Sequence, residues 1–189
     1  ISRPIKDVFS NIVLMTLVLC FKTRELLLNG LGRPHIWYEG GELNGQLAGI
    51  NFPRTTFLDW IASGVVLTRQ EKDAYTMILK YPEYHYIIGV LEGDRSTVLH
   101  ERAHATYYLD NRYCRLVNRR WTELSEKTQR FVEKRLKECG YSDDRLVDEF
   151  QAYLVENQNV FKRSEFAPLQ QELKAYLTTY KMTTKTVFL

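Results

Sequence analysis

The sequence has few cysteines and no extreme of charge. Three cysteines occur among 189 residues, far apart and without a C-x-x-C pair, so a disulfide framework and a cysteine zinc site are both disfavoured. Because the sequence also has no N-x-S/T site, it favours the cytoplasm or another reducing compartment. The net charge of +3 is too small to indicate nucleic-acid binding by itself. The three cysteines are Cys20, Cys114 and Cys139.

Long hydrophobic runs are also missing. The most apolar stretch, Ile12 to Phe21, falls short of the roughly 20 residues that a membrane-spanning helix needs, and it lacks the small-residue cleavage site of a signal peptide. We therefore predict no membrane span and place this stretch in the core as a strand or helix. Apolar residues make up 44% of the chain and charged residues 26%, which is typical of a globular protein. The length suits a single domain covering 1–189.

Periodicity and turn signals predict a helix-dominated α+β fold with a small sheet before residue 94. Thr68 and Glu71 have capping-box spacing, and Gly140 is placed to end a helix. The stretch between the motif helix and Thr122 is expected to be irregular. The expected elements are one apolar element to Gly32, strands and turns over 34–53, helices over 55–60 and 68–79, and a strand over 84–91. They continue with the motif helix from Asp94 or Ser96, a helix over 122–139, a helix from 142 and a helix over 165–180.

The residues with the clearest chemistry form the motif His100-Glu101-Arg102-Ala103-His104. Histidines four positions apart lie on one face of a helix and can bind one zinc ion at about 2.0–2.1 Å. Glu101 can then act as general base for a zinc-bound water. The alternative is a helix with two structural or surface histidines.

A catalytic zinc needs a third protein ligand, and no histidine follows His104. Glu149 shares a predicted helix face with Leu146 and Phe150, where a charge needs a partner, so we favour it as that ligand. Asp148 should point about 100° away. The alternative for Glu149 is a salt bridge to an arginine.

These residues resemble a family of zinc peptidases. An H-E-x-x-H helix with a carboxylate from a later helix is the gluzincin arrangement of the zincins, and the spacing from His104 to Glu149 is similar to that of the catalytic domain of the anthrax lethal factor group. The resemblance implies a zincin-like catalytic core over about 84–157 with one Zn²⁺ per chain. It also implies an oxyanion-stabilising role for Tyr141, although ordinary packing would also explain this residue. Tyr153 stands where that family has a second acid.

Several other residues are open to two interpretations. Tyr107 and Tyr108 could line the site or pack in the core, and Asp110 could support a ligand imidazole or sit in a surface turn. The strand over 84–91 could bind substrate along an edge or lie inside the sheet. A basic cluster could attract acidic segments or nucleic acid, or could be a solvated surface. The cluster consists of Arg112, Arg115, Arg119 and Arg120.

Taken together, the sequence predicts a zinc-dependent endopeptidase acting on a protein or peptide. Glu101 is the predicted general base, and His100, His104 and Glu149 are the predicted zinc ligands. The family resemblance also suggests a secreted effector that acts inside a host cell. A different class of function is a non-catalytic interaction domain on the same scaffold, with structural zinc or none.

Overall fold

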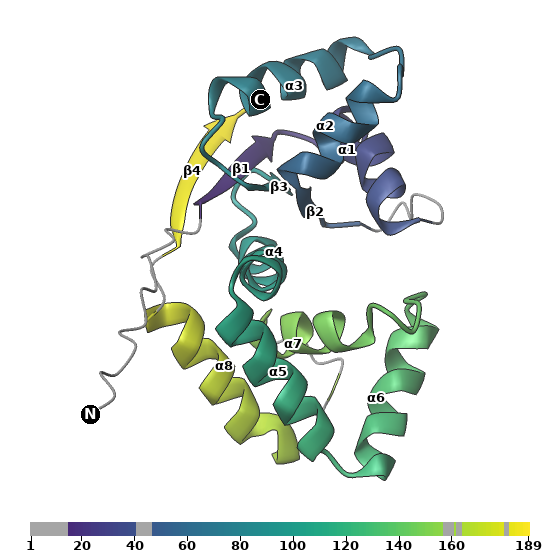
Figure 1. The fold of residues 1–189 in the computed structure, drawn as a ribbon, viewed down its shortest axis with the longest axis vertical. Helices are drawn as coiled ribbons and strands as arrows, with labels where there is room; N and C mark the ends of the chain where they lie inside the picture. The colour runs from purple at the N-terminus through teal and green to yellow at the C-terminus, as the bar shows by residue number, and fades with distance from the viewer. Residues whose placement is uncertain (1–14, 41–46, 157–160, 162–163, 180–181) are drawn as a thin grey trace, which may run out of the picture.

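The computed structural model describes residues 15–40, 47–156, 161, 164–179 and 182–189. Most of these residues are helical, and four strands form one small mixed sheet, which confirms the predicted α+β class (Figure 1). Strand β1 (Met15–Phe21) is parallel to its neighbours β3 (Tyr86–Leu91) and β4 (Thr183–Phe188), and β2 (Gly49–Pro53) is antiparallel to β3. The strand order is β2-β3-β1-β4. The predicted strand over 84–91 is therefore an interior strand, and the edge beside it is β2.

The sheet separates two hydrophobic clusters because successive side chains of a strand point to opposite faces. On one face, Leu17, Leu19 and Ile87 are fully buried against three helices, α1 (Arg24–Glu39), α2 (Arg54–Ala62) and α3 (Arg69–Lys80). On the other face, Val18 and Ile88 pack with Ala105 of helix α4 (Arg95–Leu109). The sheet with helices α1 to α3 is called the sheet lobe below.

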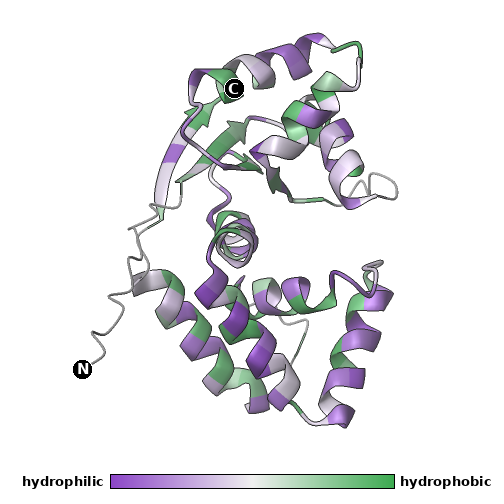
Figure 2. Cartoon of the chain, in the orientation of Figure 1, coloured by the Kyte–Doolittle hydropathy of each residue, from purple (hydrophilic) through white to green (hydrophobic). Residues whose placement is uncertain are grey.

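A second group of helices has its own hydrophobic core, and this group is called the helical lobe below. Figure 1 shows α4 between this lobe and the sheet lobe. Phe150 and Val155 are buried at the centre of the helical lobe, whereas α5 and α6 turn many hydrophilic residues outward (Figure 2). Its members are α5 (Asn111–Glu123), α6 (Glu126–Glu138), α7 (Leu146–Glu156), the 3₁₀ turn η2 (Ser164–Phe166) and α8 (Ala167–Thr179).

The start of the chain differs from the prediction of one apolar element to Gly32. The chain forms β1 and then α1, because Thr23 caps a helix by accepting a hydrogen bond from the backbone N–H of Leu26 at 3.2 Å. Helix α1 continues through Pro34 to Glu39, where strands and turns were expected. Its buried side chains, including Leu27 and Leu31, hold it against the sheet. Residues 12–14 of the apolar run lie outside the described residues.

The later part of the chain differs in two ways. The arginine-rich stretch is helix α5, which Asp110 caps by accepting from the N–H of Arg112 at 2.9 Å, and the helix expected over 122–139 begins only at Glu126. Strand β4 was not predicted, and most of its residues are exposed. The predicted helix over 165–180 is α8, and Tyr180 lies outside the described residues, as does residue 157 of the expected catalytic core.

No helix in the described part of the chain is long and apolar enough to cross a membrane. All three cysteines are free.

Candidate metal centre

Helix α4 presents the two histidines of the motif on one face. Asp94 caps the start of this helix, because its side chain accepts hydrogen bonds from the backbone N–H of Thr97 at 3.1 Å and from the hydroxyl of Thr97 at 2.6 Å. One turn of helix separates His100 from His104, and their Nε2 atoms lie 3.1 Å apart. Two ligands of one tetrahedral zinc ion lie about 3.3 Å apart. The imidazoles are therefore spaced to share an ion.

Glu149 of α7 completes a triad of ligand atoms. Its Oε2 atom lies 3.8 Å from Nε2 of His100, and its Oε1 atom lies 3.6 Å from Nε2 of His104. One ligand atom from each of the three residues can be chosen within 4.8 Å of the others. The Oε2 atom of Glu149 is buried and has no hydrogen-bond partner, as a metal ligand would be without its ion. The predicted carboxylate therefore faces the histidines, and no arginine pairs with it in the described chain.

The protonation of this triad shows what a cation would replace. Burial raises the pKa of Glu149 to about 7, against the opposing effect of the two histidines. Burial opposes the charging of His104, but Asp148 and Glu149 outweigh it and raise the pKa of this imidazole to about 10. Both shifts mean that Glu149 and His104 hold a proton more readily than these groups do in water. A zinc ion would displace these protons, because it binds the deprotonated forms.

Two further carboxylates orient the imidazoles. The Nδ1 atom of His100 lies 2.9 Å from Glu156, and that of His104 lies 2.9 Å from Asp148. When each imidazole is neutral and donates from Nδ1 to its carboxylate, Nε2 has a lone pair for a metal. Asp148 was expected to point about 100° away from Glu149, but its Oδ1 atom lies against His104, a role that sequence reasoning missed.

Asp110 has neither of its predicted roles. It is 6% exposed, caps α5 and accepts a hydrogen bond from the hydroxyl of Tyr176 at 2.7 Å. It is therefore a buried capping residue of the helical lobe.

Glu101 lies beside the triad and is held from the sheet. It is 5% exposed and accepts a hydrogen bond from the side-chain amide of Asn51 on β2 at 2.6 Å. Gly49 leaves room for this carboxylate, because a Cβ there would lie 2.2 Å from its Oε1 atom. The predicted general base is thus brought together with the predicted ligands. Neither Asn51 nor Gly49 was predicted.

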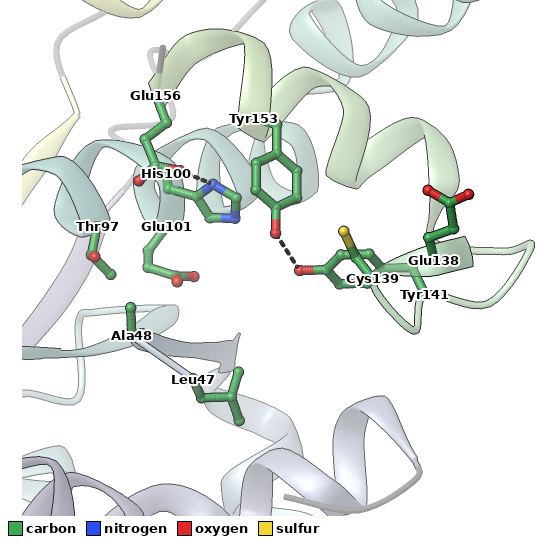
Figure 3. A pocket seen from close by; sticks show the side chains of 11 residues that line it. Leu47, Ala48, Thr97, His100, Glu101, Glu138, Cys139, Tyr141, Tyr153 and Glu156 are labelled. Atoms are coloured by element: carbon green, nitrogen blue, oxygen red, sulfur yellow. Dashed lines mark hydrogen bonds and ion pairs between the residues drawn. The ribbon is translucent and has the colours of Figure 1, made fainter. Parts of the chain in front are cut away.

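Two tyrosines close one side of the site (Figure 3). The hydroxyl groups of Tyr141 and Tyr153 are 3.0 Å apart, and the ring of Tyr153 stands edge-on to His100 with centroids 4.9 Å apart. Burial raises the pKa of both phenols, that of Tyr153 to about 12. Both therefore remain neutral hydrogen-bond donors near pH 7.

Helix α4 itself carries two tyrosines, Tyr107 and Tyr108, and neither lines the two cavities at the site. Tyr107 packs in the helical lobe and accepts a hydrogen bond from Asn118 at 2.9 Å, and Tyr108 lies against Tyr86. The core interpretation therefore holds for Tyr107, whereas Tyr108 is 51% exposed.

Two adjoining cavities meet at the site, and both are lined by His100, Glu101 and Tyr141. The first, of about 520 Å³, contains Glu101, Tyr141 and Tyr153, and Figure 3 shows Leu47 and Ala48 opposite them. The second, of about 340 Å³, adds residues on the Glu149 side, where Arg145 bridges the lobes by pairing with Glu39 at 3.1 Å. An extended ligand could therefore pass the metal position from one cavity to the other.

The arginine cluster lies on α5, away from both cavities. Arg120 binds Glu172 through two nitrogens at 2.8 Å, Arg119 lies 3.7 Å from Glu123, and Arg112 lies 3.7 Å from Asp110. Three of the four arginines thus have carboxylate neighbours, which reduces the charge that they offer to a nucleic acid.

The chain matches no known protein family, no curated protein and no solved structure. Its function must be inferred from its own site.

Proposed function

We propose that this protein is a zinc-dependent endopeptidase of the zincin type. One observation carries the proposal: three ligand atoms from His100, His104 and Glu149 meet with Glu101 beside them. The carboxylates behind both imidazoles support a metal site further, because such partners fix ligand orientation. The likeness of the motif to gluzincins agrees with the same function.

The residues of the site have distinct roles in this proposal. Zinc, when bound, would supply a Lewis acid that polarises a carbonyl and lowers the pKa of water to about 7. Glu101 takes a proton from the attacking water and passes it to the nitrogen of the departing amine. Tyr141 donates a hydrogen bond to the oxygen of the attacked carbonyl as negative charge develops there.

The substrate would enter between the lobes. Strand β2 is an edge strand, and Gly49 at its start lines both cavities. An extended peptide could bind the backbone groups on the outer side of β2, which pair with no other strand in the described part of the chain, and cross the proposed metal position. We therefore propose β2, and not the strand over 84–91, as the substrate-binding edge.

The test combines metal analysis with cleavage of a broad peptide library. We expect one zinc per chain, full loss of turnover with zinc retained in Glu101→Gln, and loss of zinc in Glu149→Ala. Glu138→Gln is the matched control, since Glu138 lines the same cavity but pairs with Arg135 at 2.9 Å. Full activity in Glu101→Gln would contradict the proposal. Zinc binding without cleavage of any peptide would favour a non-catalytic interaction domain.

A further inference from the structure

Two chains of hydrogen bonds reach the site, each running from a buried tyrosine through a carboxamide to a carboxylate. In the first, the hydroxyl of Tyr86 donates to Oδ1 of Asn51, and Nδ2 of Asn51 donates to Oε2 of Glu101 at 2.6 Å. It joins β3, β2 and α4, and is called the base relay here.

The second chain has the same chemistry in the helical lobe. The hydroxyl of Tyr113 donates to Oε1 of Gln151 at 2.8 Å, and Nε2 of Gln151 donates to Oδ1 of Asp148 at 2.9 Å. The same oxygen of Asp148 lies 2.9 Å from Nδ1 of His104. This chain, called the ligand relay here, ends on a proposed zinc ligand.

The direction of each relay follows from its first member. Burial raises the pKa of Tyr86 and of Tyr113, so both phenols keep their protons and donate. The carboxamide oxygen accepts the hydrogen bond from the phenol, which leaves the N–H of the same carboxamide to donate to the carboxylate. Each relay therefore fixes the orientation of an amide group and, through it, of a carboxylate in the site.

The burial of these groups indicates a positioning role. Tyr86 is 1% exposed, and Tyr113 and Gln151 are fully buried. Burying a hydroxyl or an amide is unfavourable unless it is hydrogen-bonded, and phenylalanine would fill nearly the same volume as tyrosine. Gly49 adds to this picture, because its lack of a side chain leaves space for Glu101 under Asn51.

We infer that the two relays have separate duties. The base relay holds Glu101 in place for proton transfer, and the ligand relay holds His104 in place for zinc. Tyr86, Asn51, Tyr113 and Gln151 are positioning residues, since none of them is among the groups that would touch zinc or the reacting atoms. This inference rests on the proposed function.

The test compares two single-hydroxyl deletions. Tyr113→Phe should weaken zinc binding about 10-fold, the lower end of the effect of removing outer partners of a metal ligand, and should regain normal kcat at saturating zinc. Tyr86→Phe should leave zinc affinity unchanged and lower kcat about 3- to 10-fold at full zinc occupancy, with KM nearly constant. Competition with a chromophoric chelator measures the affinity. Tyr75→Phe is the control, because Tyr75 is partly buried in the sheet lobe and makes no side-chain hydrogen bond in the described chain.

A double-mutant cycle tests the connection within the base relay. Asn51→Ala should lower kcat more than Tyr86→Phe does, about 10- to 100-fold, with zinc retained. Adding Tyr86→Phe to Asn51→Ala should then have no further effect, because the hydroxyl acts only through Asn51. Thermal unfolding confirms that each variant is folded.

The outcomes separate this inference from the proposed function. If wild-type protein binds zinc and cleaves peptides but the two tyrosine variants change the same quantity, or neither quantity, the separate duties are wrong. If Tyr86→Phe remains harmful in the Asn51→Ala background, the base relay is wrong. If wild-type protein binds zinc and cleaves nothing, the base half of the inference fails with the proposed function. The affinity of Tyr113→Phe then still decides the ligand half.

Discussion

At the scale of single residues, the face that α7 turns toward α4 determines the surroundings of His100. Glu149, Tyr153 and Glu156 follow at helical spacing on this face, and all three contact that imidazole. Tyr153 packs its ring against His100, and Glu156, one turn later, binds Nδ1 of the same imidazole. Tyr153 is thus free to pair with Tyr141.

The variant Tyr153→Phe tests this arrangement. It keeps the ring against His100 and removes only the hydroxyl next to Tyr141. We expect unchanged zinc affinity and a fall in kcat of about 10-fold, smaller than the roughly 100-fold or greater effect expected for loss of an oxyanion donor in Tyr141→Phe. Steady-state kinetics at saturating zinc measure both variants. Tyr107→Phe is the control, and a loss of zinc in Tyr153→Phe would contradict the expectation.

The sequence predicts the residues of the site that share a local pattern. His100, Glu101 and His104 lie within one motif, and Glu149 is an acid on an apolar helix face, so spacing alone finds them. Asn51 and Tyr86 belong to two strands, and their contact with Glu101 depends on how these strands pair. Such contacts between distant segments leave no periodic signal. Glu156 had a weaker signal, since it lies two helical turns after Glu149.

At the scale of elements, a side-chain cap stabilises the start of α4, the helix that carries the motif. Asp94 caps this helix through three hydrogen bonds from Ser96 and Thr97. Burial raises the pKa of Asp94, but these hydrogen bonds outweigh it and hold the pKa below its usual 3.8. The ionised carboxylate is therefore the form that stabilises the folded state.

Removing this cap should lower stability in a pH-dependent way. Asp94→Ala should cost about 1 kcal/mol of unfolding free energy at pH 7. Because the folded pKa is depressed, the contribution is present above the unfolded value of 3.8 and is lost as pH falls through the folded pKa. Urea unfolding from pH 7 to pH 3 measures the difference, which should shrink in acid. A constant difference would contradict it, and Asp73→Ala, on the exposed face of α3, is the control.

Elements with strong local signals were predicted well, and those held by distant partners were not. The capping box of Thr68 and Glu71 begins α3 as expected. Strand β4 was missed because it has only a short apolar end, without apolar alternation, and gains its structure from pairing with β1. Helix α5 was missed because its arginines, which line its solvent side, hide the apolar face formed by Tyr113 and Val117.

At the scale of the whole molecule, the proposed zinc joins two helices that pack against different parts of the protein. Helix α4 packs on the sheet through Val98 and Ala105, and α7 belongs to the core of the helical lobe. The ligand triad takes His100 and His104 from the first helix and Glu149 from the second. A bound ion would therefore stabilise the contact between the lobes.

Removing zinc should lower the thermal stability of the whole protein. At a free zinc concentration 100 times Kd, binding stabilises the folded state by about 2.7 kcal/mol, so a chelator should lower Tm by several degrees. Glu149→Ala should show no such shift, and Glu138→Gln should behave like wild type. Differential scanning calorimetry with and without chelator measures Tm. An equal shift in Glu149→Ala would place the ion elsewhere.

The pairing of β1 with β4 has a consequence for folding kinetics. Met15 and Thr183, the first pair of this ladder, are 168 positions apart in the chain. Closing so long a loop costs more chain entropy than joining β2 to β3, so the β1–β4 pair should form late in folding. Until it does, β1, which is rich in leucine and valine, has unpaired backbone groups along one edge. During refolding at high concentration, self-association should therefore begin at this edge.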